Sequence, residues 1–196
     1  FQSAYTVKNF SLNFNPYLYY FTNYIYLRPT GEFSVLPHSG QIYRFSQTQA
    51  MLTGFELEST YWFNKFKTEI VLEYIYNRQI KEKYPLPFTP PFNAFARLDY
   101  SLFDDNKLFE NSNIYVNGKY FAAQNRIAQN EEITPSSVVF GAGFSSDLNL
   151  GKVKPKLTIS VQNIFDTKYY SHMSFYRALE IPEQGRNIQI MLSYEF

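Results

Sequence analysis

The sequence predicts an all-β fold, an antiparallel β-barrel whose strands cross a membrane. Apolar and polar residues alternate with period 2 in segment after segment, and no stretch keeps a helical period. Short polar connectors alternate with longer ones, as in barrels that have turns on one side of a membrane and loops on the other. Aromatic residues make up 20% of the 196 residues, a load that suits interfacial girdles.

The C-terminal segment shows the alternation without a break. Its apolar or aromatic positions are Ile188, Ile190, Leu192, Tyr194 and Phe196, and the residues between them are mostly polar. A strand that closes a barrel must keep its alternation across the whole membrane. We therefore expect this segment to be the closing strand, with Phe196 anchored at the membrane interface.

Seven further segments repeat the pattern and bring the expected number of strands to eight. They are residues 9–20, 53–63, 66–77, 92–103, 113–122, 138–150 and 156–165. Residues 3–7 read as the tail of a ninth strand, and Pro16 predicts a bulge within the first full strand. The expected connectors are short at 64–65, 104–111 and 151–155, and long at 28–43, 79–91, 124–136 and 169–185.

The alternation also assigns each side chain to one of two faces. The expected lipid-facing residues are Ile70, Leu72, Leu98, Val116, Phe140, Ile159, Ile190 and Leu192. The expected lumen-facing residues are Glu69, Glu73, Asp99, Asn117, Ser160 and Gln189.

The composition excludes some classes of function for this protein. The net charge of +1 lacks the basic excess of a nucleic-acid-binding protein, and the absence of cysteine excludes disulfides and thiolate metal sites. A mean hydropathy of −0.33 would also suit a soluble β-sandwich or a lipocalin-like barrel, which is the alternative fold. The aromatic load and the long charged face favour the membrane barrel, because a wet lumen tolerates charge.

The last third of the chain carries a more specific pattern. Asn163, Ile164, Phe165, Asp166 and Tyr169 are followed by a loop, and then by Gly185, Arg186, Asn187 and a strand that ends in Phe196. This order resembles the C-terminal part of TonB-dependent outer-membrane receptors, although Pro182 stands three residues before Gly185. Gly54, Phe55 and Glu56 resemble an earlier strand of the family, so the resemblance covers residues 43–196.

The resemblance implies a barrel of about 22 strands with a plugged lumen. Residues 1–196 would form its C-terminal portion, with the plug domain and the earlier strands outside this chain. Because the chain begins at Phe1 and residues 3–7 read as a strand tail, we expect further strands upstream. The alternative is a self-contained eight-stranded outer-membrane barrel with a structural or adhesive role.

The resemblance also implies a function. The expected protein is a receptor in the outer membrane that imports a scarce nutrient, such as a metal chelate, a siderophore or a vitamin. Its expected partners are membrane lipid, an extracellular small molecule, the TonB complex through the plug, and the assembly machinery that reads the C-terminal signal, Ile188 to Phe196. We expect no enzymatic activity and no cofactor.

Residues in the expected extracellular loops are the candidates for ligand binding, because aromatic and polar side chains together line most binding sites. They are Tyr26, Arg28, His38, Arg44, Tyr84, His172, Met173 and Arg177. His38, or His172 with Met173, could bind a soft metal, but solvated loop residues are the expected role, and we predict no metal site. Glu56 and Glu58 share one face, where pairing with Arg or Lys is expected rather than catalysis. We assign Arg186 to hydrogen bonding at the extracellular rim.

Overall fold

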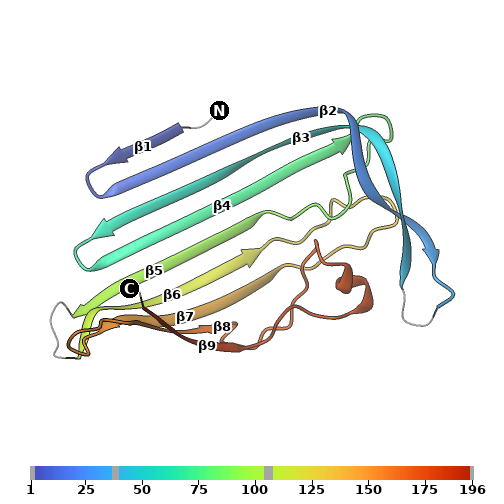
Figure 1. Ribbon diagram of the computed structural model, residues 1–196. Helices are drawn as coiled ribbons and strands as arrows, with labels where there is room; N and C mark the ends of the chain where they lie inside the picture. The colour runs from blue at the N-terminus through green and yellow to red at the C-terminus, as the bar shows by residue number, and fades with distance from the viewer. Residues whose placement is uncertain (1–2, 37–39, 104–107, 195–196) are drawn as a thin grey trace.

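The protein is one antiparallel sheet in which each strand pairs with the next in sequence (Figure 1). The computed structural model describes residues 3–36, 40–103 and 108–194. Its nine strands are β1 Ser3–Val7, β2 Phe10–Phe33, β3 Gln41–Phe63, β4 Phe66–Gln79, β5 Asn93–Phe103, β6 Phe109–Phe121, β7 Ser137–Leu148, β8 Lys156–Gln162 and β9 Asn187–Ser193. One short 3-10 helix, η1 Phe175–Leu179, interrupts the last loop. Across the described ranges, no helix has the length and apolarity to cross a membrane.

The nine-stranded sheet confirms the all-β prediction and adds the expected ninth strand as β1. Within the described residues, β1 and β9 form the two ends of the sheet and each pairs with one neighbour only. The sheet is therefore an open, curved wall (Figure 1). An open wall is the form expected for part of a larger barrel, because closure needs partners for both ends.

The predicted loop at residues 28–43 is wrong, because the two strands continue through most of it. β2 and β3 are 24 and 23 residues long, and their pairing extends to Phe33 and Gln41. At about 3.3 Å per residue, such strands are far longer than a membrane crossing requires. The excess forms a two-stranded ribbon, residues 24–33 and 41–48, which bends away from the wall (Figure 1).

The bulge in β2 lies C-terminal to Pro16, not at Pro16 itself. The pairing of Pro16 with Phe55 is in register, and the register shifts between Phe21 and Tyr24 instead. β1 pairs with β2 only as far as Phe14, so Pro16 has β3 alone as a described neighbour.

The register confirms that the predicted residues lie on two opposite faces. Ile70 pairs with Ala96, and Leu98 pairs with Val116 on the same face. On the other face, Glu69 pairs with Arg97, which pairs with Asn117. Cross-strand partners share a face of the sheet, so these pairs show which residues lie together on each face of the wall.

The wall has almost no apolar interior of its own. In the described residues, the buried hydrophobic side chains are only Ala50, Leu86 and Ala128. Large apolar side chains on the predicted lipid face are exposed, with Ile190 at 72% and Val116 at 56%. A soluble sandwich would bury this face against a second sheet, so its exposure argues for contact with lipid.

Aromatic rings pack over glycines on the polar face. A Cβ atom at Gly54 would lie 2.6 Å from the Tyr17 hydroxyl, and one at Gly143 would lie 2.4 Å from the Tyr115 ring. The guanidinium of Arg97 stacks 3.7 Å above Tyr115 and forms a bidentate pair with Asp99. Two charged residues of the predicted lumenal face, Arg97 and Asp99, are therefore paired with each other.

Several strands end earlier than predicted, and the difference is largest for β8 and β9. β8 stops at Gln162, because Asn163 adopts a left-handed conformation with φ 49° and starts a turn. β9 stops at Ser193, so Tyr194 follows the strand, and Phe196 lies outside the described residues.

Candidate functional site

Three long loops gather at one end of the sheet. They are residues 80–92, 122–136 and 163–186, and the ribbon of β2 and β3 reaches the same region (Figure 1). The opposite end carries only short connectors. The long-loop end is the part of the wall where side chains from distant sequence positions meet, so it is the candidate functional site.

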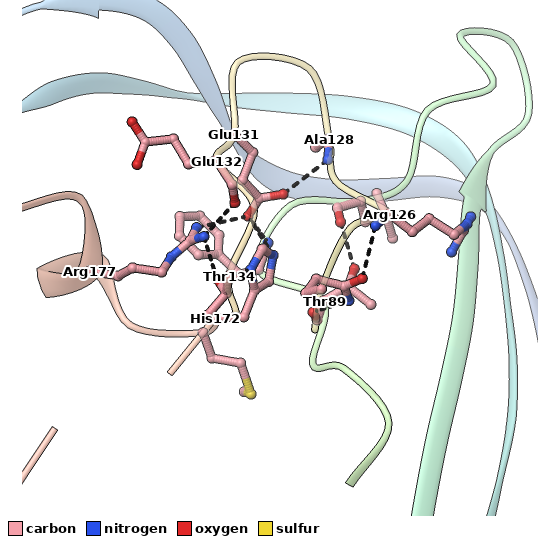
Figure 2. A network of polar contacts seen from close by, with 12 residues as sticks. Thr89, Arg126, Ala128, Glu131, Glu132, Thr134, His172 and Arg177 are labelled. Atoms are coloured by element: carbon pink, nitrogen blue, oxygen red, sulfur yellow. Dashed lines mark hydrogen bonds and ion pairs between the residues drawn. The ribbon is translucent and has the colours of Figure 1, made fainter. Parts of the chain in front are cut away.

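Glu131 is the centre of this loop assembly (Figure 2). Its side chain is only 3% exposed and accepts hydrogen bonds from the backbone N–H groups of Phe88 and Ala128, at 2.8 and 3.0 Å. It also lies 3.2 Å from His172 Nε2 and 3.6 Å from Arg177 Nη2. One carboxylate therefore connects all three loops.

The electrostatics of Glu131 follow from these contacts. Burial raises the pKa of its carboxyl, but the His172 contact and the two backbone N–H groups outweigh burial and lower the pKa overall. The carboxylate form is thus the one that holds the loops together.

His172 is buried, which corrects the prediction of a solvated loop residue. It is 2% exposed, and its Nδ1 lies 2.8 Å from Thr134 Oγ1. Its Nε2 faces Glu131 at ion-pair distance but is poorly aligned for a hydrogen bond. Nδ1 is therefore bonded within the protein and Nε2 points at Glu131, whereas the neighbouring Met173 is 57% exposed. No group of three or more metal-ligating side chains occurs in the described part of the chain.

Arg177 completes the cluster from the helix η1. It donates to Thr134 Oγ1 at 2.7 Å and to the carbonyl oxygen of Glu132. Its side chain is 10% exposed. The Arg177 guanidinium is therefore largely shielded from solvent within this loop assembly, and its predicted role in ligand binding stays a prediction.

The ribbon is attached to the loops by polar and aromatic contacts. Asn130 donates to the carbonyl oxygen of Pro29 at 3.4 Å, and Gln41 donates to the carbonyl oxygen of Asn130 at 3.2 Å. The Tyr43 ring packs against Phe88 and Phe175, with centroid distances of 5.7 and 5.3 Å. These contacts hold the ribbon over the loop assembly.

A second buried network joins the first two loops to β4. Asn77 accepts from the N–H of Leu86 at 2.8 Å and lies 2.5 Å from Thr89 Oγ1. Gln124 donates to the carbonyl oxygen of Thr89 at 2.9 Å, and Arg126 donates to the carbonyl oxygen of Asn77. The loops are therefore anchored at their bases as well as at their tips.

Asn163 and Asp166 close the base of the third loop. The Asn163 amide donates to the carbonyl oxygens of Thr167 and Gln184, and its oxygen accepts from Thr167 N–H at 2.8 Å. Asp166 accepts from the backbone N–H of Arg186 at 2.8 Å. The predicted rim hydrogen bond of Arg186 is thus made by its backbone.

The remaining predicted ligand residues are scattered. Tyr26, Arg28 and Arg44 lie on strands β2 and β3, not in a loop as predicted, because the ribbon continues the sheet. The Tyr26 hydroxyl donates to Gln79 at 3.0 Å, and Arg44 pairs with Glu32 at 3.1 Å. Tyr84 is 45% exposed in the first long loop, and His38 lies outside the described residues.

The two carboxylates considered for catalysis have amide partners. Glu56 accepts from Asn15 at 3.3 Å and Glu58 from Asn13 at 3.5 Å. Within the described residues, both partners are asparagines of β2, which pairs with β3 in that register, and pairing with Arg or Lys of a plug stays a prediction.

Sequence reasoning missed Glu131, Thr134 and Asn130, the residues that connect the loops. They lie in one polar stretch, residues 129–136, which has no periodic signal. Only the packing of three loops shows that one of its two adjacent glutamates is buried.

Fold and site together define an outer-membrane β-barrel wall with ordered loops on one side. A family described as TonB dependent receptor-like, beta-barrel, matches residues 2–164. The chain belongs to this family, so it forms a β-barrel wall in the outer membrane. This confirms the resemblance and the predicted location.

Solved structures share the fold. The copper transporter OprC superposes with a TM-score of 0.81 at 20% identity, over 98% of this chain and 30% of that chain. The FrpB iron transporter from Neisseria meningitidis, F3-3 variant, gives 0.70 at 16% identity, over 98% and 29%. The chain thus spans about 30% of the length of these transporters. No curated protein matches the sequence.

Proposed function

We propose that this chain is the C-terminal portion of a TonB-dependent importer that captures a scarce nutrient outside the cell. The observation that carries the proposal is the ordered loop assembly around Glu131, at the end of the wall that faces outward when short turns face the periplasm. Loops that are ordered in advance lower the entropic cost of ligand capture.

The open sheet supports the larger barrel over a self-contained one. Nine strands leave β1 and β9 without further partners among the described residues, and the chain spans 30% of the OprC chain. In this proposal the remaining strands and a plug domain complete the receptor. The plug contacts TonB, and the segment Ile188–Phe196 guides assembly. No enzymatic step is part of the proposal.

Growth under nutrient limitation tests the proposal. A strain lacking the full-length receptor and a strain lacking TonB are compared with the parent under limiting iron, copper, cobalamin or carbon supply. The proposal predicts the same growth defect in both strains for at least one nutrient, restored by the receptor gene only when TonB is present. Full growth of the receptor-deleted strain in every condition would contradict it.

A further inference from the structure

A column of aromatic rings rises on the lumenal face of β2 beside the loop assembly. Tyr17, Tyr19, Phe21 and Tyr24 follow one another with ring-centroid distances of 5.7, 6.2 and 5.2 Å. Tyr17 pairs with Gly54, and so lies on the same face as Glu56 and Glu73. Tyr19 is 55% exposed and Phe21 is 37% exposed, so the column is open to the lumen.

The column ends in an acceptor-rich hollow. The hollow has a volume of about 190 Å³ and is lined by Tyr17, Glu56, Glu73 and Asn93, with Pro90 and Pro91 from the first long loop. Asn93 Oδ1 is buried and, within the described residues, has no hydrogen-bond partner. Three oxygen-bearing side chains thus converge beneath the rings.

The charge of this hollow is not balanced by the described residues. Glu56 and Glu73 are direct cross-strand partners, an arrangement that is unfavourable for two carboxylates. Over residues 3–36, 40–103 and 108–194, no cation lies within ion-pair distance of either carboxylate, and Lys119 only lines the adjoining hollow with Glu73. A positive charge placed here would relieve the repulsion.

We propose that this aromatic column and its hollow bind an organic cation, a solute that carries ammonium or guanidinium groups. Ring faces attract cations, and the paired carboxylates and the Asn93 oxygen accept the N–H donors. No group of three or more His, Cys, Asp or Glu side chains occurs in the described residues, and the charge of the two carboxylates repels anionic chelates. This inference rests on the proposed import function and names the substrate class of that receptor.

Binding of spermidine to the purified full-length receptor tests the inference, with citrate as the anion of matching valence. Calorimetry should show saturable binding of spermidine that weakens as NaCl rises, and none of citrate. Tyr19→Leu and Glu73→Gln should each weaken spermidine binding about tenfold. Tyr20→Leu is the matched control, because Tyr20 is 60% exposed on the opposite face, and it should change the affinity less than about twofold.

Two results would overturn the inference. One is the absence of saturable spermidine binding by the folded receptor. The other is an equal loss of affinity in Tyr19→Leu and Tyr20→Leu, which would show that both substitutions act through folding. A receptor that still supports TonB-dependent growth but fails this test would retain the proposed function and lose only the cationic substrate.

Discussion

At the scale of single residues, glycines and one buried carboxylate determine how closely this wall packs. Because Gly54 has no side chain, the Tyr17 ring can lie across β3 at this position. Gly54 also lies next to the carbonyl oxygen of Tyr74, and a Cβ atom at Gly54 would be 2.1 Å from that oxygen. Glu131 connects three loops through contacts that no pattern in the nearby sequence predicts.

Gly54→Ala should destabilise the barrel, because the added methyl group meets a backbone atom that cannot rotate away. We expect a loss of about 1–3 kcal/mol in the free energy of unfolding. Gly118→Ala is the control, since its Cβ would meet only the Phe140 ring, at 3.2 Å. Urea unfolding of the refolded receptor in detergent measures both, and equal losses would show that the contact at Tyr74 is unimportant.

Glu131→Gln should loosen the loops without unfolding the sheet. Removing the charge leaves Arg177 and His172 without their buried partner, a change that costs on the order of 3–5 kcal/mol locally. Hydrogen exchange of residues 122–136 and 163–186 should rise, while β4 to β7 stay protected. Glu132→Gln, at the exposed neighbour, serves as control, and similar exchange in both variants would refute the central role of Glu131.

The pH dependence of the loops follows from the lowered pKa of Glu131. A carboxyl whose pKa is lower in the folded state stabilises that state fully above its unfolded pKa, about 4.3. The stabilisation by Glu131 is lost as the pH falls from the unfolded pKa to the lower pKa of the folded state. Protease resistance of the loops should therefore be constant from neutral pH to about 5 and decline below 4, and a decline already between pH 7 and 6 would assign control to another group.

At the scale of elements, the base of the third loop depends on two short sequences that meet in space. Asn163 and Asp166 both adopt positive φ, and they hold Gln184 and Arg186 at the start of β9. Their pattern was the strongest signal in the sequence, and the structure explains it as a clamp that sets where β8 ends and β9 begins.

Asn163→Ala should disrupt this clamp. Asn163 is only 3% exposed. Removing its amide leaves two carbonyl oxygens, those of Thr167 and Gln184, and the N–H of Thr167 without a hydrogen-bond partner. We expect a cost of about 1–3 kcal/mol and faster proteolysis of residues 163–186. Asn149→Ala, at the short-turn end, is the control and should leave that loop intact.

At the scale of the whole molecule, the architecture could be predicted from the sequence, but the loop assembly could not. Period-2 alternation predicted the strands and both faces, because a membrane wall has one lipid face throughout. It could not predict the ribbon, where the strands continue beyond the membrane, or the burial of His172, which depends on three loops packing together. Tyr26, Arg28 and Arg44 therefore lie on strands and not in a loop, and their role in ligand binding stays a prediction.

The central claim is that this chain is a membrane wall with one lipid face and one lumenal face. The sequence contains no cysteine, so single cysteines can be introduced in turn at Glu69, Ile70, Arg97, Leu98, Val116 and Asn117 of the receptor and spin-labelled in bilayers. Collision with lipid-soluble oxygen should be high at Ile70, Leu98 and Val116 and low at Glu69, Arg97 and Asn117. Equal accessibility at neighbouring positions, or water-soluble relaxation agents reaching both sets, would contradict the account.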